Sequence, residues 1–143
     1  MTTSSRHAVP EVLAPVRRIA VVGASDDPRR PSHGVFGRLV DAGYEVIPVN
    51  PNVTTVHGVP AVARLADIDG RIDLVDVFRN AAHAPEVARE AVAIGAGALW
   101  LQLGIRSDEA RRIAEAADMG YVEDLCLAVE VAVGGYEPAA SQR

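Results

Sequence analysis

Residues 18–25, RIAVVGAS, decide the fold. The apolar run Arg18–Val22 is short and continuous, which is typical of a strand buried on both faces of a parallel sheet. Gly23 ends the run, and the small residues Ala24 and Ser25 follow it. A buried strand that ends in a glycine turn predicts the first strand of an α/β domain.

The chain after this stretch alternates between predicted strands and helices. The helices are marked by N-terminal signals, namely a cap at Ser32, a proline at position 85 and a cap at Ser107. Residues 61–68 are expected to be a loop with a minor turn of helix, and the apolar segment up to Val133 has no firm assignment. The further predicted strands cover residues 44–49, 73–78, 98–101 and 121–124.

Strands separated by helices imply a parallel sheet with right-handed crossovers. We therefore expect one α/β domain, a Rossmann-like, doubly wound, five-stranded parallel sheet in the order 3-2-1-4-5. Ligands bind such sheets at the carboxyl ends of the strands. The domain should cover residues 18–133, between an N-terminal extension (1–17) and a C-terminal tail (134–143) that fray or lie on the surface.

Charge and composition exclude several classes of function. The net charge of −5 argues against a nucleic-acid binder, and all 14 basic side chains are arginine, so that any charged contact to phosphate comes from a guanidinium. The single cysteine, Cys126, excludes an internal disulfide framework and a multi-cysteine zinc site. No signal peptide or membrane span of about 20 apolar residues is visible, so a cytoplasmic protein is expected.

The loop after the first strand carries the features of a phosphate site. Small residues at Gly23-Ala24-Ser25 let the backbone approach a phosphate closely, and the amides of the helix that begins near Ser32 can face an anion. Arg29 and Arg30 add two guanidinium groups. The alternative is a plain strand-to-helix turn with two solvated arginines.

The dinucleotide fingerprint is absent from this loop. The glycines are Gly23 and Gly34, with a long loop between them, in place of Gly-x-Gly-x-x-Gly. Folds that bind NAD usually place an acidic residue at the end of the second strand, where it holds the ribose hydroxyl, but here Asn50 and Pro51 occupy that place. Both observations disfavour NAD.

Several short motifs then follow in order along residues 18–130, from VGAS at 22–25 to an Asp124-x-Cys126 pair. Between them lie RPS at 30–32, PVNP at 48–51, VDVFR at 75–79 and WLQLG at 100–104. Together they resemble the small bacterial CoA-binding protein family, which is similar to the nucleotide-binding domain of the succinyl-CoA synthetase α subunit. The resemblance implies that coenzyme A, or an acyl-CoA, lies across the carboxyl ends of the strands.

Carried onto this sequence, the resemblance implies a division of the site. The loop after the first strand would hold the ADP phosphates, the end of the second strand would shape the floor by the nucleotide, and the ends of the third and fourth strands would line the other side and the pantetheine arm. The implied binding residues are Gly23, Ala24, Ser25, Arg29, Arg30, Ser32, Val49, Asn50, Pro51, Phe78, Arg79, Gln102, Leu103 and Gly104.

The last motif departs from the family pattern. Relatives resemble Asp-Arg-Cys, whereas this chain has Leu125 between Asp124 and Cys126. Cys126 is interpreted as a buried small hydrophobe; the alternative is a mixed disulfide with the CoA thiol. Trp100 is expected to pack between the sheet and a helix, and Asp73 and Asp76 to cap or form salt bridges on opposite faces of their strand.

Three functions are weighed. The first is a binding module for CoA or an acyl-CoA, acting as carrier or sensor without catalysis by this chain alone. The second is an accessory subunit of an acyl-CoA ligase or transferase whose partner protein supplies catalysis. The third, an NAD(P)-binding redox domain, is disfavoured by Asn50. No metal site is expected, because no His pair or Cys/His cluster has metal spacing.

Overall fold

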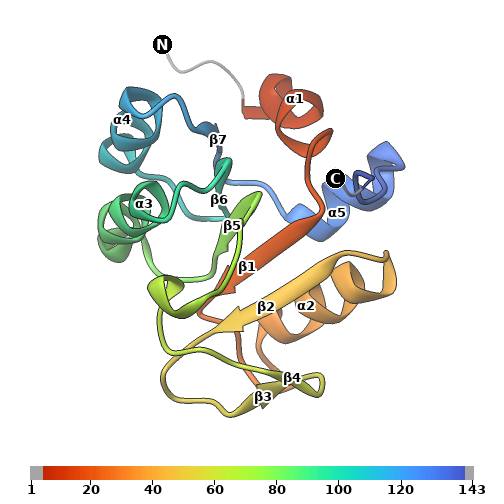
Figure 1. The fold of residues 1–143 in the computed structure, drawn as a ribbon. Coiled ribbons are helices and arrows are strands. Elements are labelled where there is room, and N and C mark those ends of the chain that lie inside the picture. The colour runs from red at the N-terminus through yellow and green to blue at the C-terminus, as the bar shows by residue number, and fades with distance from the viewer. Residues whose placement is uncertain (1–4, 141–143) are drawn as a thin grey trace.

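A five-stranded parallel sheet forms the centre of the computed structural model, which describes residues 5–140 (Figure 1). Helices cover both faces of the sheet, and a two-stranded hairpin projects from one end. In chain order the elements are η1 (Ser5–Ala8), α1 (Val9–Leu13), β1 (Arg18–Val22), α2 (Pro31–Asp41), β2 (Glu45–Val49), β3 (Thr55–Val56), β4 (Val59–Pro60), η2 (Leu65–Asp67), β5 (Leu74–Val77), η3 (Ala81–His83), α3 (Ala84–Ala93), β6 (Ala98–Leu101), α4 (Asp108–Ala116), β7 (Gly120–Val122) and α5 (Leu127–Gly134).

The sheet has the order β2-β1-β5-β6-β7. The predicted doubly wound, five-stranded parallel sheet is therefore confirmed, but the expected order 3-2-1-4-5 needs one correction. The third strand of the sheet, β5, pairs with β1 and lies inside the sheet, where the prediction placed it outside β2. Alternation of strands and helices does not decide this point, because both orders permit right-handed crossovers.

This order brings the ends of β1 and β5 together. Val22 is in register with Val77, and the amide of Phe78 donates a hydrogen bond of 2.9 Å to the carbonyl of Val22. The helix that follows β1, α2, packs on one face of the sheet, whereas α3, which follows β5, packs on the other. The topological switch point therefore lies between β1 and β5, where ligands bind in open α/β sheets.

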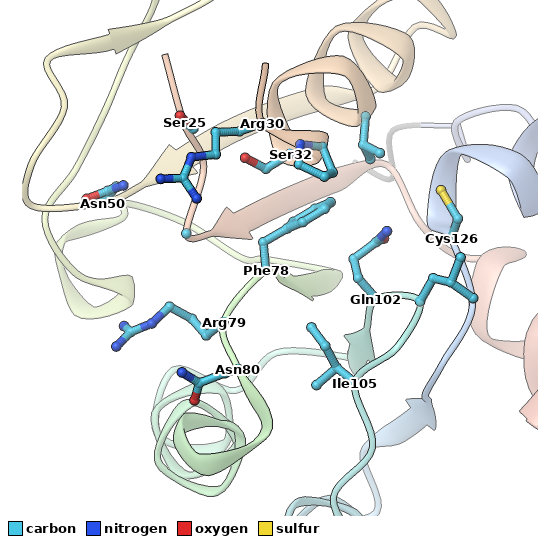
Figure 2. A pocket seen from close by; sticks show the side chains of 14 residues that line it. Ser25, Arg30, Ser32, Asn50, Phe78, Arg79, Asn80, Gln102, Ile105 and Cys126 are labelled. Atoms are coloured by element: carbon cyan, nitrogen blue, oxygen red, sulfur yellow. The ribbon is translucent and has the colours of Figure 1, made fainter. Parts of the chain in front are cut away.

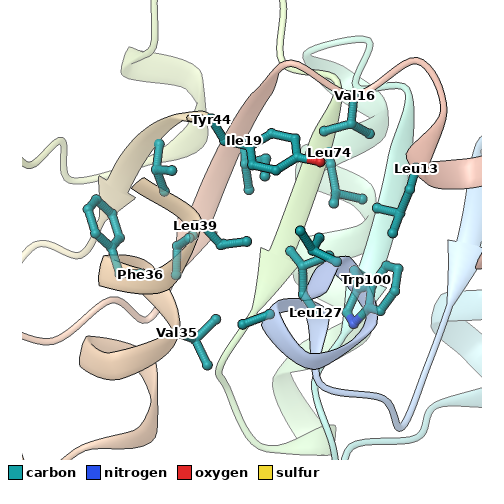
Figure 3. Close-up of a cluster of buried hydrophobic side chains, with 14 of the residues drawn as sticks. Leu13, Val16, Ile19, Val35, Phe36, Leu39, Tyr44, Leu74, Trp100 and Leu127 are labelled. Carbon is teal, nitrogen blue, oxygen red and sulfur yellow. The ribbon is translucent and has the colours of Figure 1, made fainter. Parts of the chain in front are cut away.

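Two hydrophobic clusters cover the two faces of the sheet. One joins α1, α2 and α5 to the sheet, and Figure 3 shows Phe36 and Leu39 of α2, Leu127 of α5 and Trp100 of β6 in it. The other joins η2, α3 and α4 to the opposite face. Trp100 is fully buried and donates from Nε1 to the carbonyl of Leu125 at 2.8 Å. Its expected place between the sheet and a helix is confirmed.

Where the structure describes them, the predicted N-terminal extension and C-terminal tail pack against the domain, whereas the expectation is that they fray or lie on the surface. Val12, Leu13 and Val16 are buried in the first cluster, and the amide of Ala139 donates to the carbonyl of Val16 at 2.8 Å. Residues 1–4 and 141–143 of the predicted extension and tail lie outside the described residues. The apolar side chains before β1 explain the difference, because they would otherwise leave one face of the sheet exposed to water.

Helix boundaries follow the predicted signals in part. Ser107 caps α4, and its Oγ accepts from the amide of Ala110 at 3.1 Å. Ser32 does not cap α2: the N-cap is Arg30, Pro31 occupies the first turn, and the Ser32 side chain is buried. A proline at the first position suits a helix start, because its missing N–H would have no partner there. The unassigned segment forms α5.

Asp73, which lies just before β5, and Asp76, which lies within it, have opposite environments. The Asp73 carboxylate accepts from the amides of Arg17 and Arg18 at 3.0 and 2.9 Å, as expected of a cap. Asp76 is fully buried, and its side-chain oxygens accept no hydrogen bond from any residue that the structure describes. The expected capping or salt-bridging role is therefore wrong for Asp76. Burial raises the pKa of its carboxyl well above the ordinary value.

Within residues 5–140, every helix is too short or too polar to cross a membrane.

Candidate functional site

A cavity of about 710 Å³ opens at the carboxyl ends of β1, β5 and β6 (Figure 2). We call it the site cavity. It is the place at which the sequence predicts a ligand, because the switch point between β1 and β5 lies at its floor. Its lining residues are Gly23, Ser25, Arg30, Pro31, Ser32, Val35, Asn50, Phe78, Arg79, Asn80, Gln102, Leu103, Ile105 and Cys126.

Gly23 lets the chain leave β1 directly over the end of β5. Its φ of +85° lies in the left-handed region, and a Cβ at this position would meet the carbonyl oxygen of Phe78 at 2.6 Å. Its amide donates to the carbonyl of Val49 at 2.9 Å, which also ties the turn to β2. Only glycine combines this φ with such a close approach to a neighbouring backbone.

The loop between Gly23 and α2 is held by its own side chains. Ser25 Oγ accepts from the amide of Asp27 at 3.0 Å, and the Asp27 carboxylate accepts from the amide of Arg29 at 3.0 Å and from its guanidinium at 3.1 Å. These bonds to Arg29 lower the pKa of Asp27. Arg29, one of the predicted phosphate ligands, is therefore paired with Asp27 and does not line the site cavity, whereas Arg30 does.

Asn50 braces this loop from the end of β2. Its Nδ2 donates to the carbonyl of Ala24 at 2.8 Å, and its Oδ1 accepts from the amide of Asn52 at 2.8 Å. An acidic residue could not replace it without losing the donor to Ala24. The residue that the sequence singles out as unlike an NAD site thus has a structural role, which fixes the wall that Gly23 and Ser25 form.

The N-terminus of α2 faces the same cavity. Arg30 and Pro31 begin the helix, no side chain caps its first amides, and both residues line the cavity together with Ser32. Pro31 has no N–H and the amide of His33 donates to the carbonyl of Arg30 at 3.1 Å, so the amide of Ser32 and the helix dipole are what favour an anion at this place.

Two arginines add positive charge at this end. Nine arginines form ion pairs within residues 5–140, but Arg30 and Arg79 form none there. Both are exposed, and both line the site cavity. Figure 2 shows them on the side of Phe78 that also holds Asn50. We call this part, with Ser25 and Asn80, the arginine end.

The other end of the site cavity is mainly apolar. Figure 2 shows Gln102, Ile105 and Cys126 on the far side of Phe78. Leu103 lines this end between Gln102 and Ile105, and Val35 of α2 contributes a further apolar side chain. We call this part the apolar end. The cavity thus combines a positively charged end with a hydrophobic one.

Asp124 fixes the loop that forms the apolar end. It accepts from the amide of Gly104 at 2.7 Å and from the guanidinium of Arg106 at 2.8 and 3.0 Å. The bonds from Gly104 and Arg106 lower the pKa of Asp124. Gly104 itself turns the loop, with a φ of +88°, and does not line the cavity. Leu125 is the residue at which the chain departs from the family pattern. Its backbone carbonyl accepts a hydrogen bond from Trp100, and any residue at this position could supply that carbonyl.

Gln102 and Cys126 join the apolar end to α5. Gln102 Oε1 accepts from the amide of Leu127 at 3.0 Å, and Cys126 is the N-cap residue of the same helix. Cys126 is half-buried: it packs against the first hydrophobic cluster, as expected of a small hydrophobe, but it also lines the site cavity. The pattern Asp124-x-Cys126 could have signalled this, since it follows the last strand.

A second cavity of about 520 Å³ shares Gly23, Asn50 and Arg79 with the first. Two predicted site residues, Val49 and Pro51, line this second cavity and not the site cavity. Arg64, His83, Glu86 and Glu90 complete its polar wall. The two cavities form neighbouring compartments on either side of the switch point.

The structure therefore brings together most of the predicted residues and adds several. Five lining residues of the site cavity lie outside the predicted set. Two of them belong to motifs that the sequence shows, RPS at 30–32 and Asp124-x-Cys126, and the other three are helix or loop residues without a motif: Pro31, Cys126, Val35, Asn80 and Ile105. Within residues 5–140 no group of three or more His, Cys, Asp or Glu side chains could hold a metal ion.

Comparison with known proteins identifies the family. The model of a family described as "CoA binding domain" matches residues 17–132. The chain belongs to this CoA-binding domain family. The membership expected from the motifs is confirmed, and the match covers every residue that lines the site cavity.

Relatives of the CoA-binding domain include small proteins of similar length. The chain is 43% identical to the uncharacterized protein YneT of Bacillus subtilis over 133 residues, which are 93% of this chain and 98% of YneT. A solved structure from Thermus thermophilus, described as cell-free ID.343, is 36% identical, with a TM-score of 0.83 over 92% of this chain and 98% of that one.

A further relative is part of a larger protein. The chain is 42% identical over 59 residues to the alpha subunit of the ADP-forming acetate–CoA ligase II of Pyrococcus furiosus. The match covers 41% of this chain and only 13% of that subunit.

Proposed function

We propose that this domain binds coenzyme A across the carboxyl ends of β1, β5 and β6 and acts as a binding module without catalysis by this chain alone. The observation that carries the proposal is the polarity of the site cavity. One end holds two arginines outside any ion pair of the described residues and an uncapped helix N-terminus, and the other end is apolar. CoA has the same polarity, with a phosphorylated nucleotide at one end and a pantetheine thiol at the other.

The diphosphate of CoA would lie at the arginine end. Arg30 and Arg79 would donate to its oxygens from two sides, and the amide of Ser32, in the first turn of α2, would donate from a third. The adenosine would lie towards Asn50 and Pro51, where the second cavity begins. The pantetheine arm would pass Phe78 to Gln102 and Leu103.

An arginine double variant tests this assignment. We expect Arg30→Ala with Arg79→Ala to weaken CoA binding at least tenfold, because a hydrogen bond to a charged group contributes about 1.5–3 kcal/mol. Arg38→Ala with Arg112→Ala is the matched control, since these exposed arginines also form no ion pair within residues 5–140 and line neither cavity. Isothermal titration calorimetry gives both affinities. Equal losses in the two double variants would contradict the assignment.

A thermal-shift series tests the class of ligand. A ligand at about 100 times its Kd adds about 2.7 kcal/mol to the unfolding free energy, which raises Tm by roughly 2–8 °C in a domain of this size. We expect a rise with CoA and acetyl-CoA and none with NAD, NADP or ATP. A rise with NAD and none with either CoA species would overturn the proposal.

The position of Cys126 allows a mixed disulfide with bound CoA. In thiol–disulfide exchange with CoA disulfide, the Cys126 thiolate would attack one sulfur and release one CoA thiolate. Intact-mass spectrometry would show the gain of one CoA and its loss on addition of a thiol. An unmodified mass after this treatment would mean that Cys126 lines the site without reacting with CoA.

An accessory role in an acyl-CoA ligase or transferase is a second candidate. The similarity to part of an acetate–CoA ligase subunit supports it. Size-exclusion chromatography of the protein with a ligase partner, in the presence of CoA, is the direct test. A stable complex that makes acyl-CoA would assign catalysis to the partner.

A further inference from the structure

The apolar end of the site cavity, towards which the pantetheine arm of the proposed ligand would run, is lined by several apolar side chains. Its wall is formed by Val35, Phe78 and Ile105, and Leu103 lies at the rim. The side chain of Leu103 is one of the few large hydrophobic side chains that the described surface leaves open, at 68% exposure. An apolar group placed beside it would remove this surface from water.

Gln102 supplies a fixed hydrogen-bond donor at the same end. The residue is only 5% exposed, and its Oε1 accepts a hydrogen bond from the amide of Leu127 at 3.0 Å. This bond sets the orientation of the amide group, so that Nε2 is the atom available to a ligand. No acceptor among the described residues takes a hydrogen bond from Nε2. A carbonyl oxygen is the acceptor that such a buried, uncharged donor fits best.

Among the described residues, no cationic side chain is free at this end. Arg30 and Arg79 line the opposite part of the cavity, and the guanidinium of Arg106, in the adjoining loop, is bound to Asp124 by two hydrogen bonds. An acyl group that ends in a carboxylate would therefore lose its water and gain no cation.

We propose that the apolar end binds the acyl group of a CoA thioester with a short, uncharged acyl chain, and that Gln102 Nε2 donates to the thioester carbonyl. This inference rests on the proposed CoA site and specifies its ligand. The acyl chain lies against Val35, Ile105 and Leu103, and binding involves no covalent step.

Titration calorimetry with four ligands tests the inference: CoA, acetyl-CoA, butyryl-CoA and succinyl-CoA. Each fully buried methylene should tighten binding roughly fourfold. We therefore expect butyryl-CoA to bind about three- to fifteenfold more tightly than acetyl-CoA, and succinyl-CoA more weakly than butyryl-CoA. Butyryl-CoA that binds no more tightly than CoA, or succinyl-CoA that equals butyryl-CoA, overturns the acyl site and leaves the CoA site intact. Binding of none of the four overturns the proposed function itself.

Two variants localise the effect. Ile105→Ala should weaken the binding of butyryl-CoA more than that of CoA and so reduce the advantage of butyryl-CoA, whereas Val133→Ala, at an exposed valine outside the lining of the cavity, should change neither affinity. Gln102→Glu keeps the acceptor for Leu127 and replaces the donor by an oxygen. It should remove the preference for thioesters over CoA, and it should lower Tm, because the new carboxylate is buried without a cation. An unchanged preference in both cavity variants would overturn the assignment to this end.

Discussion

Two loops frame the site cavity, and each is held by one side chain from the end of a neighbouring strand. On the β1 side, Asn50 holds the loop of Gly23–Ser25 through the carbonyl of Ala24. On the β6 side, Asp124 holds the loop of Leu103–Arg106 through the amide of Gly104 and the guanidinium of Arg106. The first brace is neutral and lies partly in the interior, whereas the second is ionic and faces water. The two walls should therefore respond differently to pH and to substitution.

The largest effect is expected at the turn of the β1 side. Gly23→Val combines a β-branched residue at φ +85° with a Cβ that meets the Phe78 carbonyl at 2.6 Å, so the ends of β1 and β5 must separate. Backbone strain and overpacking each contribute about 1–3 kcal/mol, so we expect a loss of about 2–6 kcal/mol in unfolding free energy. Urea denaturation measures it.

Gly34→Ala is the matched control for this substitution. Gly34 lies in α2, has ordinary φ and would place a Cβ in open space. We expect a gain of up to about 1 kcal/mol, because alanine favours a helix over glycine. A loss similar to that of Gly23→Val would show that the turn has no special role.

The next-largest effect on stability is expected at β5, the strand between the two walls. It carries an aspartate whose carboxyl accepts no hydrogen bond from the described residues. The Asp76 carboxyl has a pKa raised by burial, so the folded state keeps its proton at a pH where the unfolded state has lost it. Unfolding free energy therefore falls as pH rises from the ordinary Asp pKa towards the raised one, by about 1.4 kcal/mol per pH unit.

Asp76→Asn should remove this fall. Unfolding curves of the native protein and the variant, taken from pH 4 to pH 7, should diverge with the variant increasingly the more stable. Parallel curves would mean that Asp76 is ionised in the folded protein over this range.

A smaller loss is expected when the neutral brace is removed. Asn50→Ala leaves the carbonyl of Ala24 without its donor and should lower the unfolding free energy by about 1–3 kcal/mol, because an unmet buried hydrogen-bonding group costs that much. CoA binding should weaken with it, since the loop loses its position. The loss should be the same at pH 5 and pH 8, and a loss confined to one pH would contradict the neutral brace.

The smallest effect is expected at the ionic brace. Hydrogen bonds lower the pKa of Asp124, so its contribution to stability is complete above the ordinary Asp pKa and is lost as pH falls through the lowered one. Asp124→Asn should flatten the dependence of Tm on pH below about pH 4, where Asp carboxyls titrate, and change Tm little at neutral pH. Asp27, whose pKa is also lowered, acts in the same direction, so the native protein and the variant must be compared in the same buffers.

Sequence patterns alone were enough to predict the parallel sheet and most of the site. Short apolar runs, each followed by a glycine or a polar motif, mark strands and the ends at which ligands bind, because both properties depend on a few adjacent residues. Nine of the predicted positions line the site cavity: Gly23, Ser25, Arg30, Ser32, Asn50, Phe78, Arg79, Gln102 and Leu103. Arg29 does not line the cavity, because its guanidinium is bound to the carboxylate of Asp27, two residues earlier in the chain.

By itself, therefore, the sequence determined the α/β class, the strand ends that border the site cavity and the family. Only the tertiary structure decided that β5 lies beside β1, that Cys126 and Ile105 join the site, and that Asp76 is buried without a partner. The physical reason is the separation along the chain of the residues that decide each feature. Strands, turns and helix caps depend on residues close together in the chain, whereas strand order, burial and the pairing of charges depend on segments that meet only after folding.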